Sequence, residues 1–307
     1  MLAFAIRRIL AAIPTLLVVI ILSFFMIRLA PGGPFDLDRA LPAEIEANLR
    51  AAYNLDQPLV VQFWDYLLGV LQGDFGPSFK YQDHTVGELI MTGFPVSLGL
   101  GLSAILLALV LGVGLGAWAA LRQNSWLDYT VMASAMTGIV VPNFVMAPLL
   151  TLLFGIQLGW LPVGGYGNGQ FQYLLLPIVA LALPQVAYIA RLTRASMIEV
   201  LGSNYVRTAR AKGIGEALVV GRHALKGALM PVVSYLGPAT AQIITGSVVI
   251  EQIFAIPGIG RYFVQGALNR DYTLVMGVVI FFGVLIIAFN LIVDLIYGWL
   301  DPKVRYD

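Results

Sequence analysis

The sequence contains no cysteine and only two histidines, His84 and His223, which lie far apart along the chain. The absence of cysteine excludes disulfides, thiol catalysis and cysteine-ligated metals, and two distant histidines argue against a histidine-based metal site. Charge is also scarce, because 11% of the 307 residues are charged, against about 25% in a typical soluble domain. The formal net charge of +1 gives no indication of a nucleic acid or an acidic partner.

Motifs for nucleotide binding and hydrolysis are missing as well. The chain has no G-x-x-x-x-G-K-[ST], no G-x-S-x-G and no H-E-x-x-H pattern, so we predict that it is not an enzyme and binds no cofactor by itself. Its apolar stretches hold almost no ionisable residues, which ion-coupled pumps normally keep. No inverted duplication is evident. These absences favour a passive or externally powered pathway.

What the chain has in excess is hydrophobic residues, at 59% of the sequence. Long apolar runs predict an all-α polytopic membrane protein with six transmembrane helices. The predicted spans cover residues 9–29, 96–121, 129–158, 173–190, 231–250 and 273–293. The first run is too long for a signal peptide. Arg7 and Arg8 before it, and the other basic segments, place both termini in the cytoplasm.

The distribution of charge predicts the domain organisation. Residues 1–30 form the cytoplasmic N-terminus and first helix, residues 31–94 form a periplasmic cap, residues 95–298 form a core of five helices with a cytoplasmic loop at 195–230, and residues 299–307 form a cytoplasmic tail. The cap region is predominantly acidic, as expected on the outer side. Two amphipathic helices are predicted within it, at residues 42–53 and 58–72.

The central loop is long and basic, with Arg207, Arg210, Lys212, Arg222 and Lys226 against two glutamates. Residues 205–213 are predicted to form about two helical turns that end at Gly213, with Tyr205 and Ala209 on one face. Such a helix suits docking to a soluble protein. The alternative is a positively charged anchor on lipid headgroups, which the residues alone favour.

Several polar residues within the apolar stretches are candidates for a translocation path. Asn143 follows a proline near the middle of the third span, Gln185 and Tyr188 are the polar members of the fourth, and Thr245 lies on a small-residue ridge of the fifth. Polar side chains at these depths line paths or bond between helices with equal plausibility. Glu251, at the outer end of the fifth span, is a further candidate, although an interfacial anchor is the favoured interpretation there.

The loop sequences YVRTARAKG (205–213) and HALKGALMP (223–231) resemble the EAA loop of bacterial ABC importer permeases. The opening RRILAAIPTLLVVIILSFFMIRLAPGGPF, GDFGPSFKY, EQIFAIPGIG, NRDY and DPKVRY are similar to further landmarks of this family, in the same order. The likeness covers nearly the whole chain and is greatest to the B-type inner-membrane permease subunits of oligopeptide and dipeptide importers. Two departures are that Thr208-Ala209-Arg210 replaces Glu-Ala-Ala, and that Gly213 lies 18 residues before Pro231.

The resemblance implies a type I, binding-protein-dependent permease of the inner membrane, embedded in lipid and with no role for nucleic acid. It implies a heterodimer with a homologous second permease subunit, a periplasmic solute-binding protein, and two cytoplasmic ATPase subunits that bind ATP and Mg. The implied ATPase-coupling residues are Tyr205, Arg207, Thr208, Ala209, Arg210, Lys212 and Gly213. The expected substrate is an oligopeptide; alternatives are a dipeptide, glutathione, a nickel chelate or a peptide-like antibiotic. A stand-alone ion-coupled carrier or a membrane scaffold is the remaining alternative.

Overall fold

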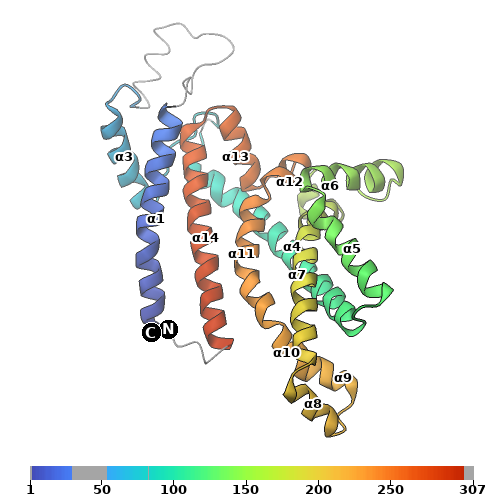
Figure 1. Ribbon diagram of the computed structural model, residues 1–307. Helices are drawn as coiled ribbons and strands as arrows, with labels where there is room; N and C mark the ends of the chain where they lie inside the picture. The colour runs from blue at the N-terminus through green and yellow to red at the C-terminus, as the bar shows by residue number, and fades with distance from the viewer. Residues whose placement is uncertain (1, 30–53, 82, 301–307) are drawn as a thin grey trace. The chain divides into compact units, whose positions relative to one another are not determined.

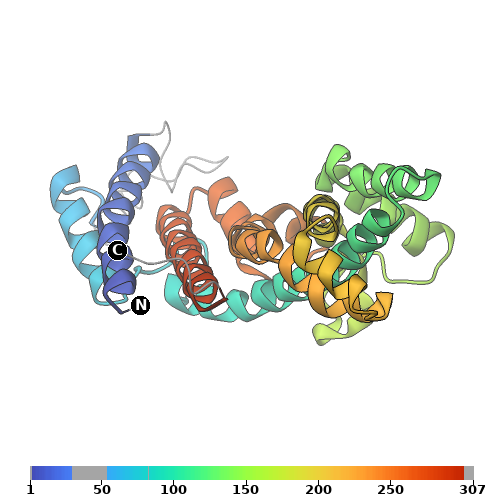
Figure 2. The same cartoon turned by 60° about the horizontal axis from the view of Figure 1, so that its bottom comes forward.

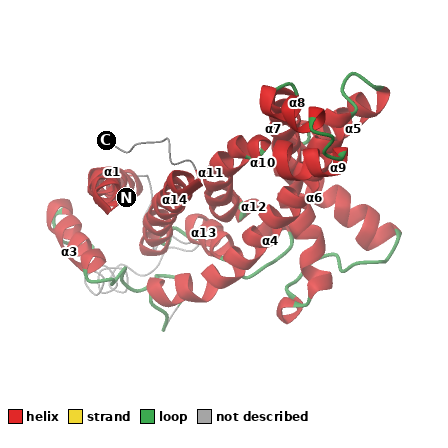
Figure 3. Cartoon of the chain, turned by 90° about the horizontal axis from the view of Figure 1, so that it is seen from below, coloured by secondary structure: helices red, strands yellow, loops and turns green. Residues whose placement is uncertain are grey.

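The computed structural model describes residues 2–29, 54–81 and 83–300, and within these ranges every regular element is a helix (Figure 3). The all-α prediction is thereby confirmed for the described part of the chain. Two compact units share it. One comprises the described residues within 2–97 and 257–287, and the other comprises the described residues within 98–256 and 288–300. Helices α4 (Val86–Leu121) and α14 (Tyr272–Leu300) each contribute to both units.

Among the described residues, five stretches of helix are long and apolar enough to cross a membrane, and a sixth is broken in the middle. The five are Ile6–Leu29 within α1 (Leu2–Leu29), α4, α7 (Phe171–Leu201), α11 with α12 (Met230–Gly246 and Val248–Ile253), and the part of α14 from Tyr272 to Leu295. Helix α7 continues to Leu201, eleven residues beyond the predicted end of the fourth span at residue 190. Its two prolines, Pro177 and Pro184, lie within this continuous helix.

In the unit formed by residues 2–97 and 257–287, α1 lies beside α3 (Leu59–Leu71), as Figure 2 shows in blue and light blue. Phe24 of α1 and Phe63 of α3 meet edge to face, with ring centroids 5.4 Å apart. Met276 and Ile280 of α14 complete this core. The amphipathic helix predicted at residues 58–72 is therefore confirmed, whereas the one predicted at residues 42–53 lies outside the described residues.

Two boundaries in this unit differ from the sequence-based prediction. Helix α4 begins at Val86 and not at residue 96, because Thr85 and Glu88 cap its start reciprocally: Glu88 N donates to Thr85 Oγ1 at 3.2 Å, and Thr85 N donates to Glu88 Oε2 at 3.0 Å. This exchange satisfies two amides that a helix start leaves unpaired. Residues 251–271, predicted to be an external loop, contain helix α13 (Ile259–Leu268).

The third predicted span is not one continuous helix. Helix α5 (Trp126–Val140) is followed by α6 (Asn143–Leu150), which continues into a π-helix (Thr151–Gln157). The bend of 106° lies between α5 and α6. Pro142 causes the break, because proline cannot donate a helical hydrogen bond and drives the preceding residue out of the helical region. Val141 accordingly has φ −87° and ψ 116°.

The other unit is organised around α7, with α5 alongside it (Figure 1). Glycines permit the helices of this unit to approach closely. A Cβ atom on Gly138 of α5 would lie 2.5 Å from the carbonyl oxygen of Leu183, and one on Gly116 of α4 would overlap the carbonyl oxygen of Ala190. The helix backbones therefore touch at these points. A short 3-10 turn (Gly167–Gly169) precedes α7, and α9 (Glu216–Leu218), a second π-helix (Val219–Ala224) and α10 (Leu225–Ala228) precede α11.

A substitution at this contact should be costly. We expect Gly116→Val to lower the free energy of unfolding by about 1–3 kcal/mol, the usual cost of overpacking a tight contact. Gly114→Val is the matched control, since a Cβ there meets nothing within 4 Å. Unfolding of both variants in detergent by heat or by a denaturing surfactant measures the difference, and equal stability of the two would contradict the close approach of α4 to α7.

Candidate functional site

The helix predicted at residues 205–213 is present as α8 (Asn204–Ala211). Gly213 ends it with φ +73°, a left-handed conformation that favours glycine. The amide of Gly213 donates to the carbonyl of Arg210 at 2.9 Å, and the amide of Ile214 donates to the carbonyl of Ala209 at 3.3 Å. Residue Gly213 is thus the stop that the sequence predicts.

One face of α8 is anchored in a hydrophobic core at the end of α7. Val206 and Ala209 are buried there with Met197 of α7, and residues of the following π-helix and α10 join them. Figures 1 and 3 show α8 and α9 at the end of α7 and α10. Tyr205 is predicted to share a face with Ala209, but the structure does not bury it there, since the residue is 50% exposed. It lies at the margin of the buried face that Val206 and Ala209 form. The Tyr205 hydroxyl lies close to Gly227 of α10, where an added Cβ atom would be 2.8 Å from the hydroxyl oxygen.

The opposite face of α8 carries the exposed residues Arg207, Thr208, Arg210 and Lys212. Thr208 bonds within its own helix, its hydroxyl donating to the carbonyl of Asn204 at 2.9 Å. Arg210 holds Glu216 of α9 through two bonds, from Nη2 to Oε1 at 2.5 Å and from Nε to Oε2 at 3.1 Å. This fork links α8 to α9 across the glycine turn and leaves Arg207 and Lys212 as the other basic groups of the face.

The Arg210–Glu216 bond gives a pH dependence. Hydrogen bonding from Arg210 holds the pKa of Glu216 below its ordinary value of 4.5. A carboxyl group whose pKa is lowered by folding stabilises the fold above the ordinary pKa, and that contribution is lost as the pH falls through the lower value. We therefore expect the link between α8 and α9 to persist at pH 4.5 and to open only in more acidic solution. Carbon NMR of glutamate-labelled protein measures this titration, and Arg210→Gln should return the pKa of Glu216 to its ordinary value.

Three of the five candidate path residues meet in one pocket of about 400 Å³ between α6, α7 and α11. Its lining comprises Asn143, Leu181, Pro184, Gln185, Tyr188, Tyr235, Gln242, Ile243 and Gly246. The hydroxyl of Tyr235 donates to Gln185 Oε1 at 2.6 Å, and the rings of Tyr188 and Tyr235 lie 5.8 Å apart. Amide and phenol groups supply the polarity of this pocket, and none of its lining residues is charged.

The other two candidates lie outside the lining of this pocket. The hydroxyl of Thr245 donates to the carbonyl of Ala241 at 2.8 Å, within its own helix. Glu251 is fully buried and accepts a bond from the Ser247 hydroxyl at 2.6 Å. Its burial inside the protein does not fit the favoured interpretation of Glu251 as an interfacial anchor. A role of either residue in the path stays a prediction.

Sequence reasoning missed Tyr235 and Gln242 of this pocket. They are seven residues apart on α11, which places them on one face of the helix. Both are polar residues in an apolar stretch, so the spacing is a signal that could have identified them. The direct bond between Tyr235 and Gln185 is a contact between α11 and α7, and no pattern within either segment specifies it.

A buried ion pair joins α5 to α7. Asp128, whose side chain is 1% exposed, accepts bonds from Arg194 Nε and Nη2 at 2.6 Å each. Asp128 Oδ2 also accepts the amide of Asn124 at 3.0 Å, and its own amide donates to Ser125 Oγ at 3.3 Å. The carboxylate therefore caps the start of α5 and fixes it to α7 at the same time.

Residues 112–306 match the family "Binding-protein-dependent transport system inner membrane component", and residues 1–101 match the N-terminal family of the same transport systems. The chain belongs to this family of inner-membrane permeases. It is an ABC importer permease subunit and a multi-pass protein of the inner membrane, in agreement with its apolar helices.

Curated relatives are similar to this chain over its full length. The chain is 57% identical over 306 residues to the oligopeptide transport system permease protein OppB of Salmonella typhimurium, covering 100% of both proteins. It is 56% identical over 306 residues to OppB of Escherichia coli K12, again covering 100% of both. The dipeptide transport system permease protein DppB of Bacillus subtilis is 44% identical over 302 residues, with 98% of this chain and 97% of DppB covered.

Two solved structures share the permease fold. The MetNI methionine ABC transporter in inward-facing conformations gives a TM-score of 0.57 at 18% identity, covering 69% of this chain and 96% of its own. An amino acid ABC transporter with histidines gives 0.55 at 17% identity, covering 69% and 94%. At these identities the likeness concerns the fold alone.

Proposed function

We propose that this permease moves oligopeptides across the bacterial inner membrane as one transmembrane subunit of an ATP-driven importer. The observation that carries the proposal is the unbroken likeness, at more than half of all positions, to relatives named as oligopeptide permeases. A dipeptide permease is similar over nearly the same length but at lower identity, which ranks the dipeptide as the second candidate.

The pocket between α6, α7 and α11 suits this class of substrate. Asn143, Gln185 and Gln242 offer amides that both donate and accept, and the two tyrosines offer hydroxyls. A peptide backbone presents the same amide groups in every sequence. Since the lining has no fixed charge, it selects neither for nor against acidic or basic side chains. We propose that these residues form part of the translocation path.

We propose further that this chain pairs with a homologous second permease subunit, and that two ATPase subunits, which hold ATP and Mg, dock on α8 in the cytoplasm. A periplasmic solute-binding protein delivers the peptide to the opposite side, and both termini of the chain face the cytoplasm. The exposed basic face of α8 and its buried apolar face support this assignment, because a helix fixed to its own core can transmit a displacement to α7 and α10.

Reconstitution in liposomes tests the proposal. With its second permease, the ATPases and the binding protein present, the chain should import a labelled oligopeptide only when ATP is supplied. The chain alone should import nothing. Preferential import of a dipeptide, glutathione or a nickel chelate would replace the substrate assignment, and ATP-independent transport by the chain alone would favour an ion-coupled carrier.

A further inference from the structure

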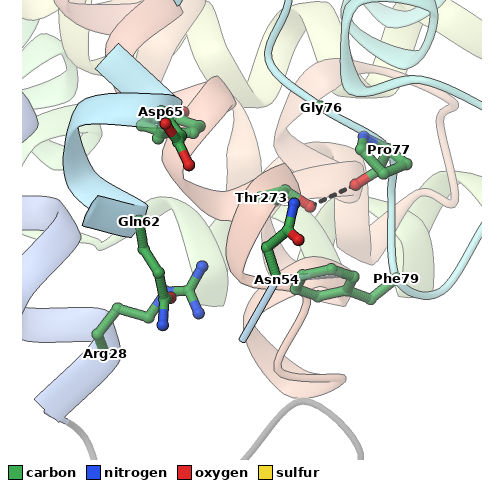
Figure 4. A pocket seen from close by; sticks show the side chains of 9 residues that line it. Arg28, Asn54, Gln62, Asp65, Gly76, Pro77, Phe79 and Thr273 are labelled. Carbon is green, nitrogen blue, oxygen red and sulfur yellow. Dashed lines mark hydrogen bonds between the residues drawn. The ribbon is translucent and has the colours of Figure 1, made fainter. Parts of the chain in front are cut away.

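A second pocket, separate from the candidate path, lies in the unit formed by residues 2–97 and 257–287. It occupies about 230 Å³ at the C-terminal end of α1, beside α3 (Figure 4). Its lining comprises Arg28, Asn54, Gln62, Asp65, Tyr66, Gly76, Pro77, Phe79 and Thr273. Most of these are polar, which is unusual beside two apolar helices and requires an explanation.

Arg28 places a positive charge in this pocket, and no carboxylate among the described residues forms an ion pair with it. Its guanidinium carbon lies 5.4 Å from the ring centroid of Phe24 and 5.5 Å from that of Tyr272. Its Nε is buried and has no hydrogen-bond partner in the described part of the chain. A partly buried guanidinium is costly unless an anion meets it, so the pocket is suited to an anionic group.

The other polar groups of the pocket need a hydrogen-bond donor. Gln62 Nε2 donates to the carbonyls of Leu55 and Gln57, at 3.3 and 2.7 Å. These two bonds fix the amide and leave its Oε1 buried without a donor, and the hydroxyl of Tyr66 is likewise buried and unpaired within the described ranges. The Asp65 carboxylate also lines the pocket, and Figure 4 shows Arg28 and Asp65 reaching it from different sides.

A ligand that carries an anion and an ammonium together satisfies both sets of groups. We propose that this pocket binds the headgroup of a zwitterionic phospholipid with a primary ammonium, such as phosphatidylethanolamine. The phosphate takes bonds from Arg28, and the ammonium donates to Asp65 and to Gln62 Oε1. Charge-assisted bonds of this kind are about twice as strong as neutral ones.

Pocket size and surroundings favour a lipid over a peptide. The volume is below the roughly 300–1,000 Å³ of pockets that enclose drug-sized ligands, so a headgroup fits while a peptide of several residues does not. The two helices that contribute to the pocket also carry exposed apolar residues, Leu22, Met26 and Leu29 on α1 and Leu68 and Leu71 on α3. Acyl chains of a bound lipid have an apolar surface to follow on these helices.

Copurified lipid provides the test. The full chain with its partner subunits is reconstituted in equal parts of phosphatidylethanolamine, phosphatidylcholine and phosphatidylglycerol, extracted in mild detergent, and analysed by mass spectrometry for retained lipid. The wild type should retain phosphatidylethanolamine about tenfold over phosphatidylcholine, whose methylated ammonium donates no hydrogen bond. Asp65→Asn should abolish this preference, and Arg28→Gln should lower retention of all three lipids.

The controls are an exposed carboxylate and an exposed arginine outside the pocket. Asp56→Asn and Arg122→Gln should behave as the wild type. If Arg28→Gln does not fold, Arg28→Lys and Asp65→Asn still decide the question. Equal retention of the ethanolamine and choline lipids, a preference for phosphatidylglycerol, or displacement of bound lipid by a short peptide would overturn the proposal. None of these readouts depends on the transported substrate.

Discussion

Arg194→Gln should lower the free energy of unfolding by about 1–3 kcal/mol, which is the usual cost of leaving a buried polar group without its partner. The reason is Asp128, which is almost fully buried and would keep its negative charge without the guanidinium that holds it with two bonds of 2.6 Å. The loss should appear as earlier unfolding in a surfactant titration or a thermal melt of the purified protein.

Two variants show whether the buried carboxylate is responsible. Arg191→Gln lies one turn earlier on α7, where the guanidinium is 5.1 Å from the Tyr188 ring, and it should cost about 0.5–1 kcal/mol, the value of an exposed cation–π contact. The double variant Asp128→Asn with Arg194→Gln should recover most of the loss, because no unpaired charge remains. Equal losses for Arg191→Gln and Arg194→Gln would show that the pair does not have this role.

Combining Arg210→Glu with Gly213→Pro should lower peptide uptake by about 5- to 150-fold. This range corresponds to a coupling free energy of ~1–3 kcal/mol. Glutamate at position 210 would face Glu216 and replace one of the three basic groups on the outward face of α8 with an acidic one. Proline holds φ near −65° and cannot adopt the φ of +73° found at Gly213. Substrate-stimulated ATPase activity of the assembled importer should fall in parallel, while membrane insertion stays normal.

A proline control exists two residues away. Gly215 has φ −59° and ψ 141°, which proline adopts without strain, so Gly215→Pro should leave uptake near the wild-type level. The charge swap Arg210→Glu with Glu216→Arg keeps an ion pair between α8 and α9 but inverts its direction. We expect this swap to stay inactive, which would assign Arg210 to partner contact. Full recovery by the swap would instead limit Arg210 to holding α9 in place.

Prediction from sequence succeeded where local patterns suffice. The apolar runs specify the helices, and the basic turn followed by Gly213 specifies both α8 and its end, since these depend on residues near one another in the chain. The break in the third stretch was missed, because the apolar run of residues 129–158 predicts one span although Pro142 signals an interruption; the bend of 106° also depends on what the two halves pack against. Helix α13 was missed because its glycines resemble a loop.

In the candidate site, too, the sequence identifies individual residues but not the contacts between distant helices. Asn143, Gln185 and Tyr188 stand out as polar residues in apolar stretches, and the structure brings them to one pocket. The bonds from Tyr235 to Gln185 and from Arg194 to Asp128 link residues 50 and 66 positions apart. Contacts at such separations are decided by the packing of whole helices, which periodicity within one segment does not reveal.

The break at Pro142 has a consequence for the surrounding membrane. Each half of the interrupted stretch has 15 residues, from Trp126 to Val140 and from Asn143 to Gln157, and rises at most about 22 Å at the 1.5 Å per residue of an α-helix. The hydrocarbon layer is roughly 30 Å thick. Neither half crosses it unaided, so hydrophobic mismatch there is greater than at the full-length helices. Transport should consequently depend on acyl-chain length and be fastest where lipids are short enough to thin the bilayer beside α5 and α6.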